Sequence, residues 1–270
     1  MKTSYTTEIG FLGLVIALSL VGFSSLFTGE QTGPNGYQAA HIVTSLAWLL
    51  LLMVQLVVIR QRRFERHRAI GLSIFGAGPV VVATLTMLTV HSAAHDAIIG
   101  RADQLVVQNV MVTVEVALLV FLAFLLRRNR TVHGAMLLST ALLFMGIALF
   151  FTLISYVPGY RSEGPGMMPR FGAAAQTSAI VGSVVGLLFF LKQRRGGWPW
   201  LLTSAFFFLN GFLQMSVDRA DRTMALTQSV ASIGRAPAFA LGFTIFAALL
   251  WLAWRANPTS RTTREIEAAL

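Results

Sequence analysis

Cysteine is absent from this chain of 270 residues, and charged residues are scarce at 12%. The lack of cysteine excludes disulfides, thiolate nucleophiles and cysteine-ligated metals. A soluble domain typically has about 25% charged residues, so the shortfall places the chain in a lipid bilayer. The two lysines, Lys2 and Lys192, flank apolar runs, which argues against a retinal-type Schiff base within the membrane. Dinucleotide-binding GxGxxG loops, P-loops and GxSxG nucleophile elbows are also missing.

Apolar residues make up 55% of the chain, and they gather in eight runs that are long enough for membrane-spanning helices. We predict an all-α, polytopic transmembrane helix bundle that forms one integral-membrane domain over residues 1–270. We expect the first run to be a retained helix rather than a signal peptide, because no small-x-small cleavage site follows it. The predicted spans are 9–27, 38–59, 69–92, 104–126, 134–157, 172–191, 198–217 and 237–254. Between the last two, the polar segment DRADRTMALTQSVASIGRAP predicts a periplasmic loop with a short interfacial helix.

The net charge of +10 comes from arginine clusters at the ends of apolar runs. This placement is typical of lipid-headgroup anchors, so we predict the lipid bilayer as a partner and no nucleic acid. With a cytoplasmic N-terminus, 15 of the 21 Lys and Arg residues fall in inner segments. The positive-inside rule therefore favours two cytoplasmic termini in a multi-pass protein of a bacterial-type inner membrane.

A weak internal repeat links two of the basic inner segments. IRQRRFERHRAIGLS and LLRRNRTVHGAMLLS each contain an arginine cluster, a histidine and the start of the next span, so that His67 aligns with His133. A helix-hairpin repeat explains this pattern, and so does convergence on basic inner loops. The two histidines are candidates for an inner ligand pair, but their arginine neighbours favour interfacial side chains.

Three other histidines are predicted to lie near the outer face. His41 lies 25 residues before Arg66, at the centre of the inner turn, and His91 lies 25 residues after it, so an equal helical rise brings both to one level. His95 follows His91 by one turn. The HxxxH spacing suits two imidazole ligands of a divalent metal, with His41 as the third. Alternatively, His41 and His91 bind haem b axially from opposite sides, or all three are interfacial side chains.

Glu115 is the single charged residue predicted well inside a span. A carboxylate at that depth costs a few kcal/mol unless it is paired, protonated or facing water, which makes Glu115 the candidate catalytic or proton-coupling residue. The alternative is a purely structural role, in which a protonated Glu115 is hydrogen-bonded to another helix. Asn210 is expected near the same depth. These groups predict a polar cavity in the outer half of the bundle, lined by His41, Ser45, His91, His95, Asn109, Glu115, Gln176, Asn210 and Gln214.

The HxxxxxxWxxxxxxQ pattern from His41 to Gln55, followed by HRxxG at 67–71, resembles the first hairpin of a group of uncharacterised bacterial multi-span membrane proteins. The resemblance covers about residues 38–150 and implies a polytopic inner-membrane protein. A later motif of that group has basic residues after its histidine, whereas here HGAML stands at 133–137. The membrane histidines are also distantly similar to those of cytochrome b561-type haem proteins, although the ligand spacing does not match residue by residue.

The sequence supports three function hypotheses. The first is a periplasm-facing histidine site that binds haem or a metal ion for redox or related membrane chemistry. The second is a proton-coupled transporter of a small or lipidic solute that uses Glu115. The third is a structural or accessory subunit whose polar residues only join helices. The equal depth of His41 and His91 places the first ahead of the other two.

Overall fold

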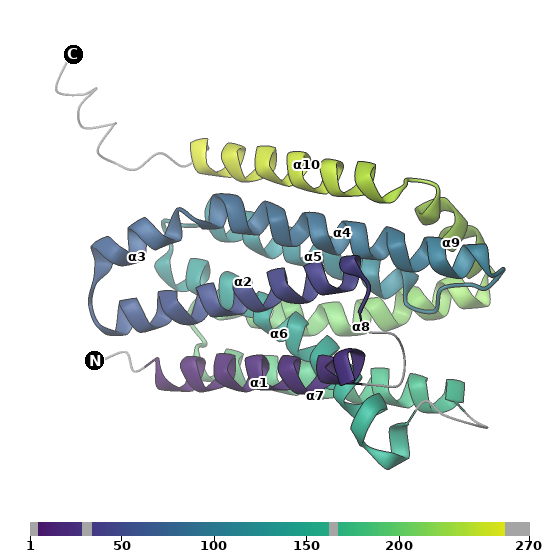
Figure 1. The fold of residues 1–270 in the computed structure, drawn as a ribbon. Helices are drawn as coiled ribbons and strands as arrows, with labels where there is room; N and C mark the ends of the chain where they lie inside the picture. Colours follow the sequence, from purple (N-terminus) through teal and green to yellow (C-terminus); the bar gives the residue numbers. More distant parts are fainter. Residues whose placement is uncertain (1–4, 29–33, 162–166, 257–270) are drawn as a thin grey trace.

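The computed structural model describes residues 5–28, 34–161 and 167–256, and within these ranges it contains helices and no strand (Figure 1). Short connections join most of the helices. The elements are α1 (Thr6–Thr28), α2 (Gly36–Arg60), α3 (Phe64–Gly71), α4 (Ile74–Ile98), α5 (Val106–Leu125), α6 (Arg130–Tyr156), the 3-10 helix η1 (Pro158–Tyr160), α7 (Met167–Lys192), α8 (Trp198–Arg219), α9 (Thr223–Ala231) and α10 (Arg235–Arg255).

Eight of the described helices are long and apolar enough to cross a membrane, namely all the α-helices except α3 and α9. This confirms the predicted all-α polytopic bundle. Seven predicted spans match their helices to within five residues at each end. The third differs, because the polar sequence FERHRAIG forms the separate helix α3 and α4 begins only at Ile74. The predicted short helix before the last span is α9, which packs against α4.

Helix α6 occupies the middle of the bundle. It contacts α1, α2, α5, α7 and α8, and Figure 1 shows it between α2 and α5 on one side and α1 and α7 on the other. Its sequence suits this position because the buried hydroxyls in its middle donate to carbonyls of the same helix. The buried hydroxyls of Ser139 and Thr140 donate to the carbonyls of Ala135 and Leu137, each at 2.6 Å. A central apolar helix therefore separates α7 from α2 and α4.

Helices α7 and α8 pack closely along a row of small residues. Ser183 Oγ donates to the Ser204 carbonyl at 3.4 Å, and Ser204 Oγ donates back to the Ser183 carbonyl at 3.2 Å. Gly182 and Gly186 lie on the same face of α7, where an added Cβ would meet Phe207 and Ser204. Small residues at such a crossing let two backbones approach, which replaces the hydrophobic driving force that lipid does not supply.

The basic inner segments gather at one end of the bundle, here called the arginine-rich end. Helix α1 begins there, α10 ends there, and α3 lies there as well (Figure 1). Lys192 Nζ pairs with Glu8 Oε1 at 2.7 Å. The Arg127 guanidinium lies 3.6 Å from the centre of the Trp254 ring, and it donates to the Trp254 carbonyl at 3.1 Å. These contacts join α1 to α7 and the α5–α6 connection to the end of α10.

Candidate functional site

A deeply buried polar contact between two spans joins Glu115 of α5 to Asn210 of α8. Asn210 Nδ2 donates to Glu115 Oε2 at 3.3 Å, and the two residues are 1% and 3% exposed. Counting residues from the inner turns predicted their equal depth, and the contact confirms it. Glu115 Oε1 and Asn210 Oδ1 are both buried without a hydrogen-bond partner among the described residues. These two oxygens are both acceptors, and no donor faces either of them among the described residues.

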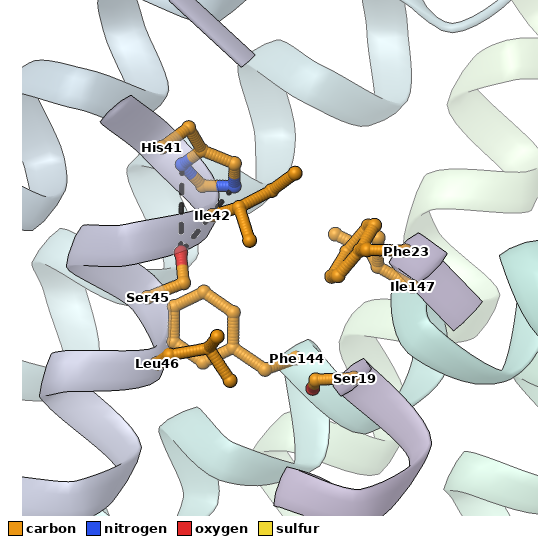
Figure 2. Close-up of a pocket in the computed structure, with 8 residues that line it drawn as sticks. All are labelled: Ser19, Phe23, His41, Ile42, Ser45, Leu46, Phe144 and Ile147. Carbon is orange, nitrogen blue, oxygen red and sulfur yellow. Dashed lines mark hydrogen bonds between the residues drawn. The ribbon is translucent and has the colours of Figure 1, made fainter. Parts of the chain in front are cut away.

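His41 lines a small cavity between α1, α2 and α6 (Figure 2). Its imidazole lies over Ser45, whose Oγ is 3.5 Å from Nδ1 and 3.4 Å from Nε2. Ser19 of α1 adds a second hydroxyl, and the rest of the lining is apolar. The cavity has room for about one water molecule. The remaining lining residues are Phe23, Ile42, Leu46, Phe144 and Ile147.

His91 has different neighbours, and the structure does not assemble the predicted metal site. The His91 ring stacks on Tyr37 with 4.6 Å between centroids, and its Nε2 lies 2.8 Å from Asn35 Nδ2. His95, one turn later, is exposed. Within the described part of the chain, no group of three or more His, Asp or Glu side chains could hold a metal ion. The ligand set of residues 41, 91 and 95 is thus not brought together, and haem or metal binding stays a prediction without structural support.

The other members of the predicted cavity are also distributed over separate places. Asn109 is half-buried in the first turn of α5. Gln214 donates to both carboxylate oxygens of Asp218 on its own helix, each at 3.0 Å, and Gln176 is exposed on α7. The prediction of one outer cavity lined by all these residues is therefore wrong. It required α7 to converge with α2 and α4, and α6 occupies that space.

A further polar site at the arginine-rich end joins Gln55, the last residue of the HxxxxxxWxxxxxxQ pattern, to the HRxxG pattern. The buried Gln55 amide accepts from the Gly71 backbone N–H at 2.8 Å and donates to the His67 carbonyl at 3.2 Å. These two backbone groups fix the amide orientation, so its N–H also donates to His67 Nδ1. Neutral His67 then carries its proton on Nε2.

This tautomer bears on the predicted inner ligand pair. With Nδ1 accepting from Gln55 and Nε2 protonated, neutral His67 has no free lone pair for a metal or haem iron. His133 Nδ1 donates to the Ala123 carbonyl at 2.7 Å, which leaves its Nε2 lone pair free. Burial, followed by the nearby His133 and Arg68, lowers the pKa of His67 from 6.5. The geometry therefore favours a structural role for His67.

Several residues that define these sites were not singled out from the sequence. Asn35 had a recognisable signal, because Asn35 and Gln38 form a capping box at the start of α2. Ser19 and Tyr37 had none, since their roles depend on which helices lie side by side. Hydropathy is uniformly high on both faces of a span and does not report lateral neighbours.

Comparison of the chain with models of protein families, with curated proteins and with solved structures finds no match. The function must therefore be argued from the geometry of the sites. Among these, the Glu115–Asn210 pair combines the deepest burial with unsatisfied polar atoms.

Proposed function

We propose that this multi-pass membrane protein is a proton-coupled transporter of a bacterial-type inner membrane, in which Glu115 with Asn210 forms the proton-binding site. The observation that carries the proposal is a pair of buried oxygens, Glu115 Oε1 and Asn210 Oδ1, for which the described part of the chain offers no hydrogen-bond partner. It favours the transport hypothesis over a histidine cofactor site, whose ligands do not converge.

Hydrogen-bond counting supports a proton on this pair. An ionised carboxylate only accepts, and an amide oxygen also only accepts. Glu115 Oε2 already accepts from Asn210 Nδ2. A proton on Oε1 supplies the missing donor for Asn210 Oδ1, so that acid and amide form a two-bond pair with no orphaned atom. The neutral form of Glu115 therefore satisfies the hydrogen bonds at the packed contact between α5 and α8.

The ionised form of Glu115 cannot satisfy the hydrogen bonds at that contact. Loss of the proton leaves a buried charge and two acceptors without donors, which costs several kcal/mol in an apolar surrounding. Val112, Val116 and Leu119 are buried on α5 around Glu115, so relief requires water or a solute at the α5–α8 contact. Proton release and opening of this contact are therefore coupled, and the coupling acts equally in both directions.

The position of Asn210 identifies the part of the bundle that would move. Asn210 belongs to α8, which is joined to α7 by the small-residue contact at Ser183 and Ser204. Glu115 belongs to α5, which packs against α4, α6 and α10. The pair therefore lies where the α7–α8 hairpin meets the rest of the bundle. Such a boundary is typical of transporters that gate by rocking one helix group against another.

Everted vesicles that contain the protein provide the functional test. A pH gradient is generated, followed with a fluorescent pH dye, and challenged in turn with tetraphenylphosphonium, with neutral amino acids and with simple sugars. We expect at least one of these to release protons in the wild type and none to do so in Glu115→Gln. Glu65→Gln, which changes an exposed acid on α3, is the matched control and should behave like the wild type. Equal proton release by Glu115→Gln would refute the proposal.

Infrared difference spectra between acidic and alkaline pH test the proton site without a solute. The wild type should show a protonated-carboxyl band that is missing in Glu115→Gln. Asn210→Leu should shift that band, because the acid then loses both bonds to the amide. A wild-type spectrum identical to that of Glu115→Gln would rule out Glu115 as the proton-binding group.

A further inference from the structure

At the end of the bundle opposite the arginine-rich end, four side chains from three helices form one contact chain. Asn35 caps α2, Tyr37 lies in its first turn, His91 is on α4, and Arg235 is the first residue of α10. The Tyr37 ring stacks on His91, and the Arg235 guanidinium lies 5.2 Å from the centre of the Tyr37 ring. None of these contacts involves Glu115, so a role for these four residues is independent of the proton-coupled function.

The Asn35 cap determines the protonation of His91. Asn35 Oδ1 accepts from the backbone N–H groups of Tyr37 at 3.1 Å and Gln38 at 2.9 Å. Its oxygen is thereby directed at the helix, and its Nδ2 faces His91 Nε2 at 2.8 Å. The donor in that bond is Asn35, so Nε2 accepts and the proton of neutral His91 is on Nδ1.

Two donors in this chain of contacts then lack an acceptor. His91 Nδ1 and Arg235 Nε are both buried without a hydrogen-bond partner among the described residues. Arg235 forms no ion pair there either, and the carboxylate of Asp96, which follows His91 on α4, pairs with Arg101 at 2.7 Å. A buried donor that is left unpaired is costly. Two such donors beside a guanidinium charge call for an anionic acceptor.

We propose that His91 and Arg235 form a binding site for an oxyanion, a phosphate or carboxylate group, with Tyr37 as its aromatic support. The oxyanion accepts from His91 Nδ1–H and from the guanidinium of Arg235, a charge-assisted geometry that suits such groups. Asn35 is exposed and His91 and Arg235 are half-exposed, so a ligand reaches the site from outside. Both donor atoms are themselves covered, so binding in this proposal requires the surrounding side chains to turn. The group belongs either to a phospholipid headgroup or to a soluble anion.

The test uses the full-length protein with ¹⁵N-labelled histidine in maltoside micelles, which contain no phosphate. Inorganic phosphate is titrated at constant ionic strength, with chloride as the reference anion. We expect a saturable shift of the His91 ring nitrogens with phosphate and none with chloride. Addition of a short-chain phosphatidylglycerol in place of phosphate distinguishes the sources: a shift with the lipid alone assigns a headgroup site, and a shift with phosphate alone assigns a soluble anion.

Variants connect the shift to the proposed donors. Arg235→Gln should weaken phosphate or lipid binding at least tenfold, and Arg235→Lys should also weaken it, because lysine keeps the charge but lacks Nε–H. Arg219→Gln, at an exposed arginine in the last turn of α8, is the matched control and should bind like the wild type. If neither probe shifts the His91 signals, or if Arg235→Gln and Arg219→Gln bind equally, the proposal is wrong.

The chain itself offers one competing occupant. Glu30 lies in 29–33, outside the described residues, and Glu30→Gln is titrated in parallel. If the wild type binds neither probe and Glu30→Gln binds phosphate, the acceptor is the chain's own carboxylate and an external ligand is excluded. Equal binding by the wild type and Glu30→Gln supports the external oxyanion.

Discussion

The side-chain nitrogen of Gln55 donates a hydrogen bond to His67 Nδ1, and this bond holds the short helix α3 against the end of α2. The bond exists only while Nδ1 has a lone pair. Protonation of His67 turns Nδ1 into a second donor that faces the Gln55 N–H. Rotating the amide does not help, because the Gly71 N–H and the His67 carbonyl already fix its orientation.

Acidification should therefore loosen α3. The pKa of His67 is lowered from 6.5 by burial and by the nearby His133 and Arg68. The stability from docking is complete above 6.5 and is lost as the pH falls through the lowered pKa. A spin label at Ala69→Cys, in a chain without natural cysteines, should become more mobile between about pH 7.5 and about pH 5.

Two reference variants make the α3 measurement specific. With Gln55→Ala, the label at position 69 should be mobile at every pH, because the amide contact is missing. A label at Gln228→Cys, exposed on α9, should show no pH dependence. Equal mobility of the α3 label at both ends of the pH range would contradict the role of His67.

Asp103 should give the opposite slope of stability with pH. Its carboxylate accepts from the Leu105 N–H at 2.8 Å, and its own backbone N–H donates to Thr227 Oγ1 at 3.1 Å. Burial raises the pKa of Asp103 from 3.8, an effect opposed by its hydrogen bonds to Leu105 and Ser92. A raised pKa stabilises the fold below 3.8, and this stability is lost as the pH rises through the raised value.

Asp103→Asn tests this slope, because asparagine keeps the oxygen that accepts from Leu105 and does not titrate. Thermal unfolding in detergent between pH 4 and pH 7 should show a stability that falls less, or rises more, with increasing pH in Asp103→Asn than in the wild type. Asp221→Asn removes an exposed acid and should leave the slope unchanged. A slope that survives in Asp103→Asn would mean that another group causes it.

Depth along the membrane normal could be predicted from the sequence, because each helical residue rises by the same amount. The contact between Glu115 and Asn210 confirms that reasoning. The eight spans could also be predicted from the sequence, since a run of about 20 apolar residues has few alternatives to a membrane helix. The short polar helix α3 could not be predicted, because its sequence is too brief for a periodic signal.

Lateral placement could not be predicted for a different physical reason. His41 and His91 lie on consecutive spans, yet His41 faces Ser19 of α1 and His91 faces Tyr37. Lipid-facing and protein-facing sides of a span are both apolar, so the sequence barely records how each helix is rotated. The central position of α6 is not signalled by any single residue, and it is what separates the predicted cavity into distinct sites.

Gly186 should be among the least tolerant positions of α7. A Cβ at this glycine would meet Ser204 Oγ, Leu142 Cδ2 at 2.9 Å and the Trp200 carbonyl at 3.0 Å. Gly186→Ala should therefore lower the free energy of unfolding by about 1–3 kcal/mol through overpacking. Gly172→Ala, on the same helix and with no described atom within 4 Å of the added Cβ, is the control and should be neutral or slightly stabilising. Unfolding of both variants in mixed micelles gives the comparison, and equal stabilities would contradict the close α7–α8 contact.

Trp48 and Thr140 should be energetically coupled across the contact between α2 and α6. Trp48 Nε1 donates to Thr140 Oγ1 at 2.9 Å, while the Thr140 hydroxyl proton is engaged by the Leu137 carbonyl. The threonine oxygen is thus free to accept, and both residues are almost fully buried. A double-mutant cycle with Trp48→Phe and Thr140→Val should give a coupling free energy of about 0.6–1.7 kcal/mol, the range for polar contacts between spans.

The control for this cycle pairs Trp48→Phe with Thr203→Val. Thr203 is a buried threonine on α8 whose hydroxyl donates to the Pro199 carbonyl of its own helix at 3.0 Å. Because Thr203 shares no bond with Trp48, the two effects should add to within about 0.5 kcal/mol. Coupling of the same size in both cycles would show that Trp48→Phe disturbs the bundle generally. Coupling only with Thr140 assigns the energy to the bond that fixes α2 against the central helix.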